Sequence, residues 1–141
     1  MSQLKTALYE LHKKKGAKLI NFSGYSLPVW FTNIQSEHQV IREDVGMFDI
    51  SHMGVYTLNG EGVKEFLQNL TCNNLNKANG KVIYSMVLNE KGGVLDDVMV
   101  GQLGDTFYLI VNAGNKQKII DWFEVHNKNN IKIEELTTSH G

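Results

Sequence analysis

The chain has 141 residues, 42% of them apolar, and a formal net charge of −1 at pH 7, which fits one domain with a real hydrophobic core. It has no Lys/Arg stripe to neutralise phosphates and no apolar run near the roughly 20 residues that span a bilayer, so we expect neither a nucleic-acid nor a membrane partner. Its start, Met1–Lys5, lacks the apolar core of a signal peptide, and its single cysteine, Cys72, excludes an internal disulfide, so we expect a cytoplasmic location.

The first residues are predicted to form a helix and a short strand. Apolar residues recur at helical spacing from Leu4 to Leu11, and Gly16 follows as a C-cap. Residues 17–22 are predicted to be a strand. The aromatic-rich stretch 25–31 holds the only proline and is interpreted as an irregular packed segment.

A second helix is predicted to begin after Thr32. The spacing from Thr32 to Gln35 matches a capping box, in which Thr32 is the N-cap, and the apolar face continues to about Asp44. Residues 47–50 are then predicted to form another strand. We assign residues 1–54 to an N-terminal helical and extended segment.

From residue 55 the apolar pattern predicts a strand–helix–strand unit, a hairpin, and a closing helix and strand. The predicted ranges are 55–59, 62–70, 81–88, 94–103, 106–112, 116–127 and 131–135, with Asn115 as N-cap of the last helix. This order predicts an α+β fold over residues 55–141, a ferredoxin-like variant in which helices pack on one face of an antiparallel sheet.

The hairpin over residues 84–97 carries the most unusual chemistry. Asn89–Gly93 suits a tight turn, and the strand that follows holds two adjacent carboxylates, Asp96 and Asp97, among apolar residues. Alternation places these two side chains on opposite faces of the sheet. A carboxylate on an apolar face must be paired or hydrogen-bonded, which makes it a candidate functional group. The alternative is a structural carboxylate that backbone amides satisfy.

Other familiar sites lack their signatures. The five histidines, at positions 12, 38, 52, 126 and 140, form no pair at helical spacing and have no cysteine at ligand distance in sequence, so no metal site is expected. Adjacent Ser51 and His52 point apart on an extended segment and cannot pair as nucleophile and base. Asp97 therefore remains the best catalytic candidate.

Four stretches, taken in order, resemble one family. They are Gly16–Lys18, Arg42–Gly54, Gly92–Asp97 and Val111–Ala113. Together they resemble the N-terminal part of the T-protein family of the glycine cleavage system, the tetrahydrofolate-dependent aminomethyltransferases. The resemblance covers essentially the whole chain. It implies that the ferredoxin-like unit is part of a larger folate-binding fold, and that the segment of residues 1–54 contributes to the folate-binding region.

The resemblance also implies a reaction. An aminomethyl group on the lipoyl arm of the H-protein gives its one-carbon unit to tetrahydrofolate, forming 5,10-methylenetetrahydrofolate and releasing ammonia. Asp97 matches the family carboxylate that assists the folate nitrogen, so its expected role is catalytic. Met53, Tyr84 and Asn112 match family positions that line the folate cavity. Their structural alternatives are a core methionine, a core tyrosine and an asparagine that precedes a helix.

Three positions depart from the family pattern. Ala7, Tyr25 and Gly101 stand where relatives often have proline, tryptophan and tyrosine, and Gly101 leaves the expected cavity wall without an aromatic ring. Family members also continue well past residue 141, with residues that complete the folate site. We therefore expect an N-terminal fragment that is inactive alone and prone to self-association.

Two other functions fit the same residues. One is a different folate-dependent one-carbon enzyme, such as a demethylase or a module of an amine-oxidising enzyme. The other is a folate-binding module without catalysis.

Overall fold

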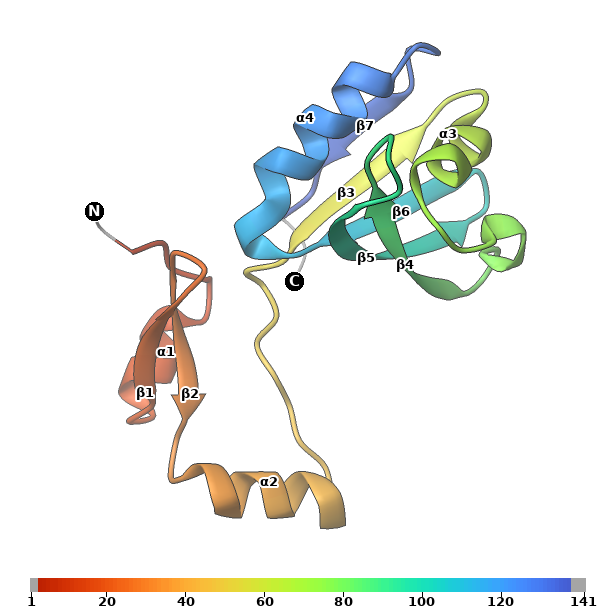
Figure 1. Cartoon of the computed structure of the whole chain (residues 1–141). Coiled ribbons are helices and arrows are strands. Elements are labelled where there is room, and N and C mark those ends of the chain that lie inside the picture. Colours follow the sequence, from red (N-terminus) through yellow and green to blue (C-terminus); the bar gives the residue numbers. More distant parts are fainter. Residues whose placement is uncertain (1–2, 138–141) are drawn as a thin grey trace. The chain divides into compact units, whose positions relative to one another are not determined.

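The computed structural model of the chain describes residues 3–137. Its contacts divide the chain into two compact units, residues 1–52 (unit 1) and residues 53–141 (unit 2), and each unit is described by itself (Figure 1). The described part of unit 1 contains α1 (Tyr9–Lys14), β1 (Lys18–Phe22), β2 (Tyr25–Trp30) and α2 (Ile34–Glu43).

The strands β1 and β2 form an antiparallel hairpin, so the prediction of an irregular segment over residues 25–31 is wrong. Proline is tolerated inside β2 because the ladder is irregular at that point. Pro28 pairs with Leu19, and the register shifts between Leu19 and Lys18, so the missing N–H falls beside a bulge. The connecting turn places Gly24 at a φ of 87°, a conformation that suits glycine.

The two predicted helices of unit 1 exist, but their N-terminal ends differ from the predictions. The helix α1 begins at Tyr9 because Leu4 is extended, donating its N–H to Gly24 O at 2.9 Å. The N-cap of α2 is Asn33 and not Thr32. The side-chain oxygen of Asn33 accepts from the N–H of Ser36 at 2.8 Å.

The predicted strand over residues 47–50 is also wrong. This stretch has the apolar content of a strand, but it pairs with no other strand in the described part of the chain. Its one carboxylate, Asp49, instead binds three side chains of unit 1. It accepts from Thr6 Oγ1 at 2.8 Å, from His12 Nε2 at 2.8 Å and from the hydroxyl of Ser51.

Unit 2 agrees closely with the prediction. Every predicted helix and strand is present, with ends that differ by one residue at most. They are β3 (Gly54–Asn59), α3 (Val63–Leu70), β4 (Val82–Leu88), β5 (Val94–Leu103), β6 (Thr106–Val111), α4 (Lys116–His126) and β7 (Lys132–Glu135). Two 3-10 turns, η1 (Leu75–Lys77) and η2 (Ala113–Asn115), complete the described elements.

The five strands of unit 2 form one antiparallel sheet in the order β4-β5-β6-β3-β7 (Figure 1). The helices α3 and α4 cover one face, where Phe66 and Phe123 meet edge to face at 5.5 Å. The alternating residues Val98 and Val100 of β5 are buried in the same core. The predicted α+β fold class is therefore confirmed.

The opposite side of this sheet, which neither α3 nor α4 covers, is called here the helix-free face. Strand alternation assigns to it the side chains of β4, β5 and β6 that lie between the buried core residues. These side chains are Tyr84, Met86, Asp97, Met99, Tyr108 and Ile110. Within residues 3–137 no helix combines the length and the apolar content that crossing a membrane requires.

Candidate functional site

The turn between β4 and β5 is held by one asparagine side chain. Asn89 Oδ1 accepts from the N–H of Lys91 at 2.9 Å and from the N–H of Gly93 at 2.8 Å. Gly92 adopts a φ of 77°, in the left-handed region that favours glycine. These contacts fix the beginning of β5. They thereby help to set the register of β5 against β4, which determines where Asp96 and Asp97 lie.

The two carboxylates point to opposite faces of the sheet, as alternation predicts. Asp96 is only 7% exposed and lies on the helix-covered face, whereas Asp97 is exposed on the helix-free face. Asp96 is not held by backbone amides, which corrects the structural alternative drawn from the sequence. Its Oδ1 accepts from Asn115 Nδ2 at 2.8 Å and from Asn112 Nδ2 at 3.1 Å. Its Oδ2 is buried without a hydrogen-bond partner in the described part of the chain.

Asp97 accepts a hydrogen bond from the residue that follows β6: Asn112 Nδ2 donates to Asp97 Oδ1 at 2.9 Å. Tyr84 on β4 lies close enough to Asp97 for the two side chains to interact electrostatically. The pKa of Tyr84 is raised, first by partial burial and then by its interaction with Asp97, so the phenol stays protonated.

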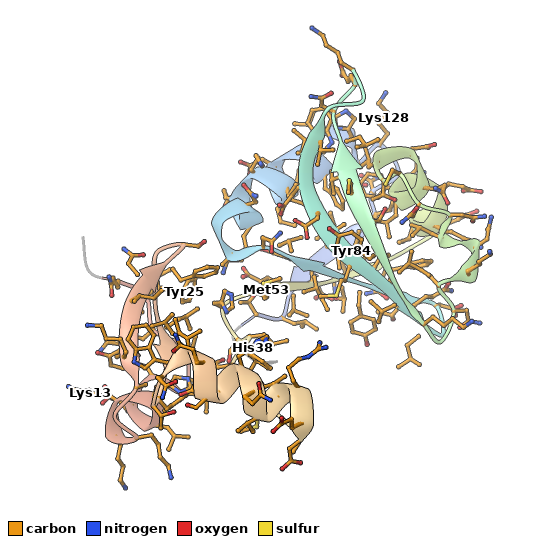
Figure 2. The ribbon with its side chains drawn as sticks, turned by 60° about the horizontal axis from the view of Figure 1, so that its bottom comes forward. Lys13, Tyr25, His38, Met53, Tyr84 and Lys128 are labelled. Atoms are coloured by element: carbon orange, nitrogen blue, oxygen red, sulfur yellow. The ribbon has the colours of Figure 1, made fainter. Side chains whose placement is uncertain are left out.

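The register of β3 and β6 brings Met53 to the same end of the sheet. Gly54 pairs with Val111, so the next residues outward are Met53 and Asn112. Figure 2 shows Met53 where the chain enters β3, and Tyr84 on β4. A hydrogen bond thus joins Asp97 to Asn112, and Tyr84 interacts electrostatically with Asp97, while strand register alone places Met53 beside Asn112.

The structure bears differently on the purely structural roles considered for Tyr84, Met53 and Asn112. Tyr84 is 55% exposed, so it is not a core tyrosine. Met53 is half-buried at the entrance to β3. Asn112 precedes the turn η2, but its amide is directed to the two carboxylates and makes no helix cap.

Sequence reasoning missed the part played by Asn115. It stands at the predicted N-cap position of α4, yet its side chain makes no capping hydrogen bond, because the amide donates to Asp96 instead. The available signal was the spacing of Asn112 and Asn115 around a short turn, opposite a buried carboxylate in a neighbouring strand.

Among residues 3–137, no three His, Cys, Asp or Glu side chains gather closely enough to hold a metal ion.

Position 101, where the resemblance implies an aromatic ring, is a glycine on this face. Gly101 pairs with Tyr108 on β6 and with Val82 on β4. A Cβ atom at position 101 would lie 3.5 Å from Val82 Cγ2, which is ordinary van der Waals contact. The backbone at Gly101 therefore leaves room for a side chain that the sequence does not supply.

Comparison with known proteins connects this geometry to one family. The family model described as "GCVT N-terminal domain" matches residues 8–141. The chain is 46% identical over 123 residues to an aminomethyltransferase of Chloroherpeton thalassium, covering 86% of this chain and 34% of that protein. It is 38% identical over 137 residues to an aminomethyltransferase of Flavobacterium psychrophilum, covering 96% of this chain and 38% of that protein.

A solved structure agrees with these sequence matches. The crystal structure of glycine cleavage system aminomethyltransferase T from Bartonella henselae matches with a TM-score of 0.87 at 32% identity, over 96% of this chain and 39% of that one. The chain thus spans little more than a third of the length of these relatives. The resemblance drawn from the sequence motifs is confirmed, and the chain belongs to the GCVT N-terminal domain family.

Proposed function

We propose that this chain is the folate-binding portion of a tetrahydrofolate-dependent aminomethyltransferase of the glycine cleavage system. Its small-molecule ligand is tetrahydrofolate, and its protein partner is the lipoylated H-protein. The observation that carries the proposal is Asp97, an exposed carboxylate on a largely apolar sheet face, hydrogen-bonded by the side chain of Asn112 and beside Tyr84. Family membership over residues 8–141 supports it.

The residues around Asp97 fit a flat, partly polar ring. Tyr84 and Met99 pair across β4 and β5, and Ile110 pairs with Met99 from β6, which makes an aromatic and aliphatic wall. Such a wall suits one side of a pterin, and a carboxylate at its edge supplies acceptors for ring N–H groups. Met53 and Asn112 border the same end of the sheet.

Asp97 has the electrostatic role in this proposal. Tetrahydrofolate supplies the nucleophilic nitrogen that takes up the one-carbon unit. A fixed carboxylate close to that nitrogen favours the positive charge that develops on it and can accept its proton. Since Asn112 is a donor to Asp97, it keeps the carboxylate oriented as an acceptor.

Two rival functions use the same geometry. Another folate-dependent one-carbon enzyme would need the same wall and carboxylate, and a non-catalytic folate module would need the wall alone. Dependence of turnover on aminomethyl-lipoyl H-protein separates the proposed reaction from both.

The first experiment is a titration of the 141-residue chain with tetrahydrofolate, followed by amide NMR. We expect perturbed signals on the helix-free face and weak binding, with a dissociation constant of roughly 0.1 mM or above, because the chain spans about a third of its relatives. Tyr84→Ala should weaken binding about tenfold through loss of aromatic contact. Val125→Ala changes an exposed side chain of α4, the helix on the opposite face of the sheet, so it is the control and should change nothing. Absence of any perturbation at millimolar folate would contradict the proposal, and nanomolar affinity would contradict an incomplete site.

The second experiment tests catalysis in an enzyme of family length, made by joining residues 1–141 to the remaining part of the Chloroherpeton relative. Asp97→Asn keeps the size of the side chain but removes its charge, so turnover should fall by roughly two to three orders of magnitude. Folate affinity and melting temperature should change little. Asp96→Asn should reduce turnover less and melting temperature more, because Asp96 is buried. Near-normal turnover in Asp97→Asn would show that another residue has the catalytic role.

A further inference from the structure

The side-chain amide of Asn112 lies between the two carboxylates. Its Nδ2 is 2.9 Å from Asp97 Oδ1 and 3.1 Å from Asp96 Oδ1, with Asp97 O at 3.2 Å. An amide nitrogen carries two protons, and Asn112 Nδ2 donates both of them to Asp96 and Asp97. Asn112 is therefore the link between a buried carboxylate on one face of β5 and an exposed carboxylate on the other.

We propose that Asp96 is a positioning residue for the folate site: it selects the orientation of the Asn112 amide and, through it, the orientation of Asp97. This inference rests on the proposed function of Asp97. Asp96 does not face the helix-free side and contacts no ligand in the proposal. It acts only through Asn112.

The selection has an electrostatic cause. If the Asn112 amide turned over, its carbonyl oxygen would face two carboxylate oxygens, and like partial charges at hydrogen-bond distance repel. With the carboxylates in place, only the orientation with Nδ2 inward is favourable. The carbonyl oxygen of Asn112 is then directed away from Asp96 and Asp97, where it can accept a hydrogen bond from an N–H group of a ligand.

Asn115 holds Asp96 in the position that this selection needs. Its Nδ2 donates to the same Oδ1 at 2.8 Å, from the turn η2 that follows Asn112. The backbone N–H of Asn115 also donates to Asn112 O at 3.0 Å, which closes that turn. Lys118 Nζ binds Leu95 O at 2.6 Å and adds a further tie between β5 and the first residues of α4.

A purely structural role explains Asp96 less well. Its Oδ2 is buried without a partner in the described residues, and a buried acceptor that lacks a donor is unfavourable. An uncharged asparagine would fill the same space, but its amide can itself turn over and present a donor to Asn112. A carboxylate can only accept, so it fixes the Asn112 orientation and an amide does not.

The direct test is NMR of the Asn112 side-chain amide without folate. In the unaltered chain these protons should exchange slowly with solvent, because both are hydrogen-bonded. In Asp96→Ala the exchange should speed up about tenfold, the factor expected when one hydrogen bond is lost. In Asp96→Asn it should lie between the two. Thr71→Val is the matched control, since it removes another buried polar group of unit 2, a hydroxyl bonded to Leu67 O, without touching Asn112.

The functional test is a double-mutant cycle on tetrahydrofolate affinity. Asp96→Ala and Asn112→Ala should each weaken binding about tenfold, and the double variant should be no weaker than Asn112→Ala alone, because Asp96 acts through Asn112. Thr71→Val should lower stability but leave affinity unchanged. Additive losses of tetrahydrofolate affinity in the double variant would overturn the inference. So would an Asp96→Ala variant in which both the exchange of the Asn112 amide and the tetrahydrofolate affinity are unchanged.

The amide-exchange test and the affinity test together distinguish failure of the proposed function from failure of the inference about Asp96. If the chain binds no tetrahydrofolate, the proposed function fails, while amide exchange still decides whether Asp96 positions Asn112. If Asp96→Ala does not fold, Asp96→Asn keeps the side-chain size and decides the question by itself. Unchanged exchange of the Asn112 amide in a folded Asp96→Asn variant would overturn the inference.

Discussion

In unit 1 a single carboxylate joins residues that are far apart in the sequence. The side chain of Asp49 is 1% exposed and accepts from Thr6, His12 and Ser51. Burial alone would raise the pKa of Asp49, but the hydrogen bonds from Ser51, His12 and Thr6 outweigh it and hold the pKa well below its ordinary value of 3.8. The ionised form is thus stabilised by folding.

This lowered pKa predicts acid sensitivity of unit 1. A carboxylate whose pKa falls on folding contributes stability that is full above pH 3.8 and is lost as the pH falls below it. Asp49→Asn should therefore lower the free energy of unfolding by roughly 3 kcal/mol near neutral pH, and the difference from the unaltered chain should shrink between pH 4 and pH 2. Denaturant unfolding in a Trp122→Phe background, where Trp30 fluorescence reports unit 1, measures this.

The control for that measurement is Asp44→Asn, which alters an exposed aspartate at the end of α2. It should leave the pH dependence of unfolding unchanged. A difference between Asp49→Asn and the unaltered chain that stays constant down to pH 2 would mean that the charge of Asp49 is not what stabilises unit 1.

Residue-level prediction succeeded where alternation or a motif determined the answer. Strand period alone assigns Asp96 and Asp97 to opposite faces. The Asp96–Asn115 contact joins β5 to the start of α4 across 19 residues of sequence, and no periodic pattern encodes it. The sequence predicts a capping role for Asn115 because an asparagine before a helix usually has one.

At the scale of elements, β4 and β5 were predictable because their apolar alternation agrees with their turn chemistry. The strand β2 was not, since Pro28 argues against a strand unless a bulge lies beside it. The composition of residues 47–50 predicts a strand that the structure lacks, because composition describes propensity and says nothing about a partner strand. Whether a stretch finds a partner strand depends on the tertiary structure and not on its own composition.

Two glycines of the β4–β5 hairpin should respond in opposite ways to the same substitution. Gly92→Ala forces a side chain into a φ of 77° and should lower the free energy of unfolding by about 1 kcal/mol. Gly101→Ala adds a methyl group at ordinary contact distance in an extended strand, and should raise it by roughly 0.5–1 kcal/mol. Trp122 fluorescence in a Trp30→Phe background reports unit 2 during denaturant unfolding.

Each of these variants serves as the control for the other, because both lie in one hairpin and add the same methyl group. A loss of stability in Gly101→Ala as large as that in Gly92→Ala would mean that the strand has no room at position 101. The absent family aromatic at that position would then be a consequence of packing.

At the scale of the whole chain, ordered motifs predicted more than periodicity did. Stretches from Gly16 to Ala113 predicted the family, and the match over residues 8–141 confirms it. Periodicity predicted unit 2 well because its helices and strands bury one face each within a single core. It predicted unit 1 less well, since α2 buries no residue in the structure and much of the apolar surface is exposed.

That exposed apolar surface leads to a prediction about assembly. Four apolar residues near the end of unit 1 lie within six positions and are exposed by 78%, 98%, 66% and 56%: Val45, Met47, Phe48 and Ile50. Contiguous exposed apolar side chains favour association because contact removes them from water, whereas single scattered ones do not. The apparent mass in light scattering should therefore rise above 15.9 kDa as the protein concentration increases.

The comparison that tests this cause uses two sets of substitutions. Met47→Ser with Phe48→Ser removes the two central apolar side chains, and it should shift the onset of association to about tenfold higher concentration, or about 1.4 kcal/mol of lost contact free energy. Val125→Ser removes one isolated side chain that is 75% exposed on α4, and it should leave the onset where it was. An unaltered chain that scatters as a monomer at millimolar concentration would contradict the prediction, because a patch of this size would then be too small to bring two chains together.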